Sequence, residues 1–278
     1  TILNPSISTK DKDAFKYEGD EIVADIEKMT PLEAYMYESM FKSKNFYVKV
    51  RGDLALFTAP PTKGGSERFS YLVPTQQALH GIVDAIYFKP TFTNIVSEVK
   101  VINRIQTEIM GMRNLYLDGA IDRSNISYLS DVEYLIKFYF TWNDSRMDLK
   151  NDRNISKHES IMERSLKKGG RRDIFLGSRE CLGFAEEIAE DEYEDSKSFY
   201  QGQEIDFGLM FQTFSYPTKQ LPEFWSYYSK ILMKDGVITF KDIKDCEVRN
   251  KLSNTEYTIA DQIKSVDNEY NEIQSWEE

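Results

Sequence analysis

The chain has 278 residues, of which 41% are hydrophobic and 13% aromatic, and it carries a formal net charge of −11. This length suits one large domain or two small ones, and the apolar content is sufficient for a buried core. No apolar run approaches the roughly 18–20 residues that cross a bilayer, and the N-terminus lacks the charged-then-apolar order of a signal peptide, so we expect a cytoplasmic protein that does not contact membranes.

The charge is distributed unevenly and suggests three parts. Residues 1–44 carry a net charge of −3 and are weakly patterned, which predicts an N-terminal extension. Residues 45–184 carry +4, whereas residues 185–278 carry −12. Within the middle part, residues 146–179 hold ten Lys and Arg against five Asp and Glu. This local excess is compatible with a polyanionic partner, and a solvated charged face is the alternative.

In the first third of the chain, the pattern of apolar residues predicts two helices, a strand and a loop. In chain order these are a short helix at 31–41, a strand at 46–58 that bends at Gly52 and Asp53, a Pro- and Gly-rich loop at 59–70, and a helix at 75–88. The second helix has apolar side chains every three to four residues, and Pro90 stops it.

The remainder is predicted to be rich in strands, with one further helix. The expected elements are strands at 93–109 and 130–143, a helix at 154–170, a strand and turn at 172–188, an exposed acidic loop at 185–198, strands at 205–217 and 236–240, and a polar, acidic tail at 254–278. The β-branched and aromatic run at 130–143 predicts a central strand. Asn154 is expected to cap the helix, which ends at Gly169 or Gly170. This order predicts an α+β fold.

The sequence offers few groups for catalysis. It has no H-x-x-x-H or C-x-x-C motif, and its two histidines are too few for a histidine-rich metal site. It also lacks a Walker loop, a G-x-S-x-G motif and a G-x-G-x-x-G motif at a strand-to-helix turn. We therefore expect neither a metal nor a cofactor, which leaves metal-free chemistry or no chemistry.

Lys157 and His158, at the start of the 154–170 helix, form the pair with the clearest mechanistic use. Cleavage of RNA without a metal requires removal of the 2′-hydroxyl proton, stabilisation of the phosphorane charge and protonation of the departing 5′-oxygen. Histidine can transfer either proton, and lysine can stabilise the charge. A Lys-His dipeptide also arises by chance in many proteins, so the pair alone does not establish a site.

Other residues have both a functional and a structural interpretation. Tyr87, at the end of the 75–88 helix, is a core or edge aromatic by its pattern alone, and His80 is expected to be structural. The aromatic residues that could stack on RNA bases or simply fill the core are Phe69, Tyr71 and Phe88. The turn at 169–172 combines two glycines with Arg171 and Arg172, which suits bidentate contact with phosphate.

Three segments together resemble one known family. They are GDLALFTAPPTKGGSERFSYLVPTQQALHGIVDAIYFKPT (52–91), VKVINRIQTEIMGMRN (99–114) and DRNISKHESIMERSLKKGGRRDIFLGSRECLGF (152–184). They resemble the type I-C (Dvulg) branch of the CRISPR-associated "Cas-five" family. The resemblance implies a ferredoxin-like, RRM-related RNA-binding and catalytic domain at 45–184, followed by a small antiparallel β region and tail at 185–278.

The resemblance also implies an activity. Members of this branch are metal-independent endoribonucleases that cut precursor CRISPR RNA in the repeat beside its stem-loop. They then stay on the 5′ handle as a subunit of the Cascade complex in antiviral defence, together with its backbone and large subunits. The family's catalytic tyrosine falls on Tyr87 in AIYFKPT, and its lysine and histidine fall on Lys157 and His158 in DRNISKHESI.

The basic residues of the same segments are expected to contact RNA: Lys63, Arg68, Lys89, Arg153, Lys167, Lys168, Arg171 and Arg172. Two alternatives stay open. The chain could be a non-catalytic subunit that caps the 5′ handle of the mature crRNA, as relatives in other type I systems are. Residues 1–44, which lie outside the resemblance, could dock an additional partner.

Overall fold

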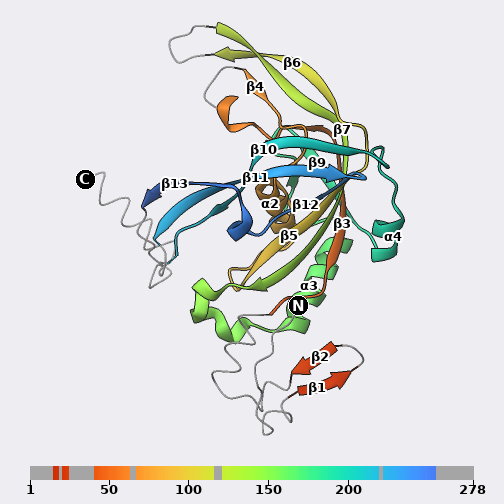
Figure 1. Ribbon diagram of the computed structural model, residues 1–278, viewed down its shortest axis with the longest axis vertical. Helices are drawn as coiled ribbons and strands as arrows, with labels where there is room; N and C mark the ends of the chain where they lie inside the picture. The colour runs from red at the N-terminus through yellow and green to blue at the C-terminus, as the bar shows by residue number, and fades with distance from the viewer. Residues whose placement is uncertain are drawn as a thin grey trace, which may run out of the picture.

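The computed structural model describes residues 15–18, 21–24, 41–62, 67–115, 121–218 and 222–254. The helix predicted at 31–41 and the tail predicted at 254–278 lie almost entirely outside the described residues. Strands β1 (Phe15–Glu18) and β2 (Glu21–Ala24) form a separate antiparallel pair (Figure 1).

One large sheet contains all the other strands that the structure describes. They are β3 (Phe46–Ala55), β4 (Arg68–Phe69), β5 (Phe92–Val101), β6 (Gln106–Leu115), β7 (Ile121–Trp142), β8 (Ile174–Phe175), β9 (Leu182–Glu187), β10 (Glu204–Ser215), β11 (Glu223–Lys234), β12 (Val237–Thr239) and β13 (Val248–Asn254). The order along the sheet is β10-β11-β12-β5-β7-β3-β9-β8, with β13 on β11 and with β4 and β6 on β7. Only the short β4–β7 pair is parallel. The fold is therefore mixed α/β, with a mostly antiparallel sheet and few helices.

The helices among the described residues are α2 (Gln76–Ile86), α3 (Ile155–Lys167) and α4 (Glu190–Asp195), and 3-10 turns lie at Pro60–Thr62, Asp144–Asp152 and Ile243–Asp245. The side chain of Thr75 caps α2 by accepting a hydrogen bond from the Ala78 amide (3.2 Å), and the apolar stripe of this helix is buried as predicted. Among the described helices, none combines the length and apolarity needed to span a bilayer.

Strand β7 confirms the prediction of a central strand. Its inner half lies between β3 and β5 and buries Ile136, Phe138 and Phe140 completely. The strand is longer than predicted, because its outer half pairs with β6 in a hairpin that extends beyond the rest of the sheet (Figure 1). The single strand predicted at 93–109 is wrong, because the chain leaves β5 at Val101 and starts β6 at Gln106. Gln106 pairs with Ser130 of β7, next to Asp131, which has φ 52°.

The bend predicted at Gly52 and Asp53 is also wrong, because β3 continues to Ala55. Gly52 serves close packing instead. A Cβ at this position would lie 2.5 Å from Cδ1 of Leu176 and 2.9 Å from the carbonyl oxygen of Leu182. The glycine therefore lets the β8–β9 connection lie directly against β3.

The acidic run at 185–198 is not an exposed loop. It contains the end of β9 and the helix α4, where Tyr193 is buried against Tyr47 with ring centroids 5.0 Å apart. The buried Lys100 ammonium donates to the carbonyl oxygen of Ser196 (3.2 Å) just beyond the helix. A cation at the C-terminal end of a helix offsets its dipole, which explains why so acidic a segment is ordered here.

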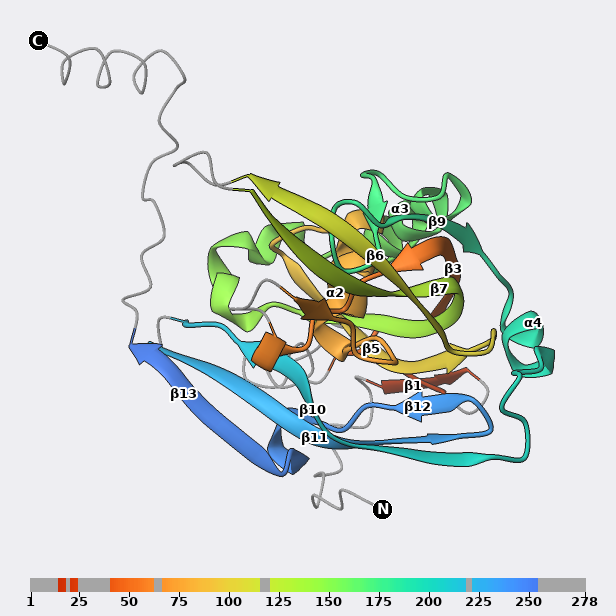
Figure 2. The ribbon, with the colours of Figure 1, turned by 90° about the horizontal axis from the view of Figure 1, so that it is seen from above.

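The C-terminal strands bring the sheet around to α2. The strands at 205–217 and 236–240 are confirmed as β10 and β12, whereas β11 and β13 were not predicted. Gln212 donates from Nε2 to Oε1 of Gln76 (3.0 Å), and Thr213 donates from Oγ1 to Oε1 of Gln77 (2.9 Å). Helix α2 thus lies between β10 and β5, and it also contacts α3 (Figure 2).

Candidate active site

Helix α3 begins and ends as the sequence predicts. The Asn154 side chain caps it by accepting a hydrogen bond from the Lys157 amide (2.9 Å). Beyond its last residue, Gly169 and Gly170 adopt φ +76° and +109°, a region that only glycine enters readily. These local signals fix where Lys157 and His158 stand on the first turn of the helix.

His158 belongs to the buried face of α3. It shares this face with Met162 and Ser165, and its relative exposure is 0%. The rings of Phe92 and Trp142 lie against it, with centroids 5.2 and 6.0 Å from the imidazole. A helix that is otherwise anchored by apolar residues therefore places a histidine in the core.

Two hydrogen bonds define the protonation of His158. Its Nε2 lies 2.8 Å from the carbonyl oxygen of Asp152, which can only accept, so Nε2 carries a proton and donates it. Burial lowers the pKa of His158 and keeps the ring neutral, so Nδ1 is an acceptor. The Tyr87 hydroxyl lies 2.9 Å from Nδ1 and donates to it.

Tyr87 terminates α2 and is only 1% exposed. Burial raises the pKa of its phenol, so the hydroxyl stays protonated at neutral pH. The guanidinium of Arg171 covers the ring at 4.7 Å from its centroid. The proton of Tyr87 therefore points at a buried base, and an exposed cation lies over the ring.

Lys157 is half exposed, and its ammonium donates to the Asp152 carboxylate. The same carboxylate accepts from Oγ1 of Thr91 (2.8 Å) and lies 3.5 Å from Nε2 of His158. The hydrogen bonds from Lys157 and Thr91 lower the pKa of Asp152. Asp152 thus connects the lysine and the histidine. The sequence analysis missed this role, although Asp152 opens the segment that contains both residues.

The predicted RNA-binding residues are only partly brought together. Lys89, Lys167, Lys168, Arg171 and Arg172 are exposed on α3, its terminal turn and the residues after Tyr87. Arg68 is partly exposed on β4, which pairs with the outer half of β7.

Of the other two predicted residues, one is not on this surface and one lies outside the described residues. The Arg153 side chain is 3% exposed and donates to the carbonyl oxygen of Asn143 (3.0 Å), so it does not belong to the exposed basic surface. Lys63 lies outside the described residues.

The remaining predicted residues are distributed between surface and core. Phe69 and Phe88 are exposed, whereas Tyr71 is partly buried and accepts a hydrogen bond from the Phe211 amide (3.4 Å). His80 lies on the partly exposed side of α2, with Nδ1 3.9 Å from the Asp84 carboxylate.

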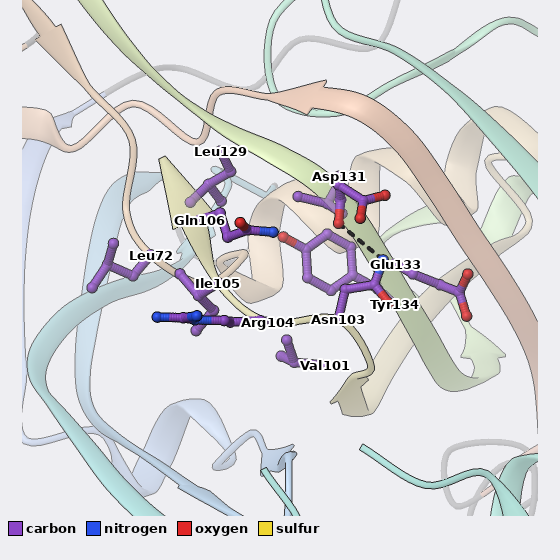
Figure 3. A pocket seen from close by; sticks show the side chains of 11 residues that line it. Leu72, Val101, Asn103, Arg104, Ile105, Gln106, Leu129, Asp131, Glu133 and Tyr134 are labelled. Atoms are coloured by element: carbon purple, nitrogen blue, oxygen red, sulfur yellow. Dashed lines mark hydrogen bonds between the residues drawn. The ribbon is translucent and has the colours of Figure 1, made fainter. Parts of the chain in front are cut away.

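A small hollow lies beside the turn between β5 and β6. Figure 3 shows the Tyr134 ring in it, next to a hydrogen bond from Nδ2 of Asn103 to the carbonyl oxygen of Asp131 (3.0 Å). None of the predicted site residues lines this hollow. Throughout the part of the chain that the structure describes, no group of three or more His, Cys, Asp and Glu side chains is arranged to hold a metal ion.

The depressed pKa of His158 predicts a pH effect on stability. Below about pH 6.5, His158 of the unfolded chain binds a proton, whereas His158 of the folded chain stays neutral. The free energy of unfolding therefore falls as the pH drops from 6.5 toward the folded-state pKa. We expect the melting temperature to fall between pH 7.5 and 5.5. In His158→Gln this fall should become smaller, whereas in His80→Gln, which replaces the other histidine, it should persist. An equal fall in the His158 variant would contradict the assignment.

Together, the fold and the site define a mixed α/β protein on a mostly antiparallel sheet, with a hydrogen-bonded Tyr–His–Asp–Lys cluster beside a basic turn. A family model described as CRISPR-associated protein (Cas_Cas5) matches residues 47–241. The chain belongs to this family.

Individual relatives agree with this result. The chain is 32% identical over 143 residues to a protein of Thermus thermophilus named CRISPR pre-crRNA endoribonuclease Cas5d, and the match covers 48% of this chain and 59% of the relative. A protein of the same name from Mannheimia succiniciproducens is 28% identical over 141 residues, which covers 42% of this chain and 60% of the relative. The chain thus spans about three fifths of the length of these curated relatives.

A solved structure, described as the crystal structure of a CRISPR-associated protein, is 56% identical to the chain. The match covers 76% of this chain and 98% of that structure, with a TM-score of 0.67.

Proposed function

We propose that this protein is an endoribonuclease that cleaves precursor CRISPR RNA in the repeat beside its stem-loop. It then remains on the 5′ handle as a subunit of Cascade, next to the backbone and large subunits. The observation that carries the proposal is the continuous chain of contacts from Tyr87 through His158 and Asp152 to Lys157, in a member of this family. The names of the curated relatives support it.

The proposal includes a finer description of the fold. Elements β3, α2, β5, β7, α3 and β9 follow the order β-α-β-β-α-β, and their strands lie in the order β9-β3-β7-β5, which supports a ferredoxin-like unit. We take residues 45–184 as the RNA-binding and catalytic domain and residues 185–278 as a C-terminal β region. Residues 1–44 then form an extension.

The cluster suggests how the reaction proceeds. As the 2′-oxygen attacks the phosphorus, its proton passes to the Tyr87 oxygen while the Tyr87 proton passes to Nδ1 of His158. Lys157 stabilises the negative charge of the phosphorane. The bond to the 5′-oxygen then breaks, and the same couple returns the proton to that oxygen. The products are a 2′,3′-cyclic phosphate and a 5′-hydroxyl, with no net consumption of protons and no metal in any step.

Access to the cluster requires one movement. Tyr87 and His158 are shielded from solvent. The exposed Arg171 lies over the Tyr87 ring and also donates from Nε to Oγ of Ser165 (3.1 Å). A phosphate group offers the guanidinium a stronger, charged partner than a hydroxyl. Binding of RNA therefore draws Arg171 away from the Tyr87 ring and opens the site.

The test is cleavage of a labelled repeat RNA in EDTA. We expect wild type to make a single cut and to leave a substrate with a 2′-deoxy nucleotide at the cut site intact. Binding of both RNAs without any cut would support the second candidate function, a non-catalytic cap on the 5′ handle. The complete burial of Tyr87 and His158 is the observation that favours that alternative, because buried residues also serve the core.

The basic turn predicts the salt dependence of binding. Replacing Arg171 and Arg172 together with alanine should weaken RNA binding and make the slope of log K against log salt shallower by up to about 1.4, roughly 0.7 per lost phosphate contact. Filter binding across a salt series measures both quantities. Lys230→Ala with Lys234→Ala removes the same charge from exposed positions on β11 and should leave the slope unchanged. Equal slopes in all three proteins would contradict the assignment.

A further inference from the structure

An open hollow lies on the outer side of α2, next to the terminal turn of α3. Gly81 and Ala85 of α2, and Phe88 just beyond the helix, form one wall, since residues at this spacing share a helix face. Arg172, Phe175 and Arg179, which follow α3 in the chain, also line the hollow. The hollow is separate from the Tyr87–His158 cluster, which lies on the buried side of the same two helices.

The aromatic residues of the hollow are available to a ligand. Phe88 is 49% exposed, although phenylalanine side chains in folded proteins are usually buried. The ring of Phe175 is partly exposed, and the Arg179 guanidinium lies 5.9 Å from its centroid. Exposed aromatic faces beside a guanidinium are what unstacked nucleobases use in single-stranded RNA complexes.

The hollow has two arginines, Arg172 and Arg179, that could contact a phosphate. Arg172 donates from its guanidinium to the carbonyl oxygen of Asp84 (2.6 Å), and its amide donates to the carbonyl oxygen of Ala85 (3.1 Å), so its position at the rim is fixed. The Asp84 carboxylate already accepts from Nδ2 of Asn94 (2.8 Å). Asp173, the second carboxylate of the lining, is an acceptor that suits an amino group of a base.

We propose that this hollow holds one unstacked nucleotide of the bound RNA. Its base lies between Phe88 and Phe175, and its phosphate contacts Arg172 and Arg179. The inference rests on the proposed RNA-binding function and adds a site to it. Arg171 covers Tyr87 while Arg172 borders the hollow, so the consecutive arginines lead one strand from the cutting site to the nucleotide site.

Gly81 provides a test that does not disturb the fold. A Cβ built at this position meets no atom within 4 Å, so a larger side chain extends into the open hollow. Glycine in a helix interior is also unfavourable, so the substitution should maintain or raise the melting temperature. Gly81→Leu therefore fills the hollow, and Phe88→Ala removes one stacking face from an exposed position.

The experiment measures the affinity of the full chain for a repeat RNA that carries a 2′-deoxy nucleotide at the cut site. We expect Gly81→Leu and Phe88→Ala each to weaken binding about 5- to 100-fold, as loss of one base–aromatic stack does. Gly111→Leu on β6, where the nearest atom is Oδ1 of Asn125 at 3.8 Å, is the matched control and should bind like wild type.

The outcomes separate the two proposals. If wild type cleaves the unmodified RNA and both variants bind as tightly as wild type, the nucleotide site is overturned while the proposed function stands. If wild type binds no repeat RNA, both are overturned. The nucleotide site is supported if both Gly81→Leu and Phe88→Ala bind RNA more weakly than wild type. In that case the melting temperature of Gly81→Leu should be at or above that of wild type.

Discussion

Replacing His158 with alanine is expected to lower the rate of repeat RNA cleavage by about 10²- to 10⁴-fold, the usual contribution of a positioned acid–base group. The loss follows from the geometry, because Nδ1 of His158 is the atom that receives the Tyr87 proton. RNA affinity should change little, since the side chain is fully buried and reaches no exposed surface. Single-turnover cleavage and equilibrium binding, measured on the same RNA, separate the two effects.

The control for this variant must account for the cavity that it creates. Met162 is also fully buried and lies one turn further along the same face of α3. Met162→Ala should lower the free energy of unfolding by about 2–5 kcal/mol and still cleave at a rate near that of wild type below its melting temperature. If both variants lose cleavage equally, His158 acts through packing and the catalytic assignment is wrong.

Lys157→Ala should produce the second large effect, a loss of cleavage of about 10²- to 10³-fold, as expected when one group that stabilises transition-state charge is removed. Its side chain is half exposed, and an exposed ion pair such as that with Asp152 contributes only about 0–1 kcal/mol to stability. The melting temperature should therefore stay near that of wild type. Activity and melting curves on one protein preparation test both statements.

Arg164→Ala is the matched control for Lys157→Ala. It removes one exposed cation from the same helix without a contact to the cluster. We expect it to cleave within a fewfold of wild type. Comparable losses in both variants would show that the overall charge of α3, and not the position of Lys157, governs the reaction.

The sequence predicted those features whose signals are local. Helix α3 was predicted because Asn154 and the pair of glycines mark its two ends, and the inner part of β7 was predicted because it is rich in β-branched and aromatic residues. The outer half of β7 was missed because its pattern is polar, and it is held mainly by pairing with β6. The acidic helix α4 was missed because its stabilising cation, Lys100, lies on a distant strand.

The candidate site shows the same division. The spacing of Lys157 and His158 on one helical turn could be predicted, and the resemblance to the family added Tyr87. The hydrogen bond between Tyr87 and His158 joins residues 71 positions apart, so it depends on the tertiary fold. The burial of His158 could not be predicted either, because the rings that enclose it come from β5 and β7.

The pairing of β7 also has a consequence for synthesis. The four strands from β3 to β6 all pair with β7 and none of them pairs with another of the four. On the ribosome, β3 ends at Ala55 and β7 ends at Trp142, so about 87 further residues, roughly 4 to 17 s of translation, follow β3 before its first partner is complete. During this interval the apolar faces and unpaired edges of β3 and β5 are exposed together. The nascent chain up to residue 142 is thus the stage at which this protein most needs protection from aggregation.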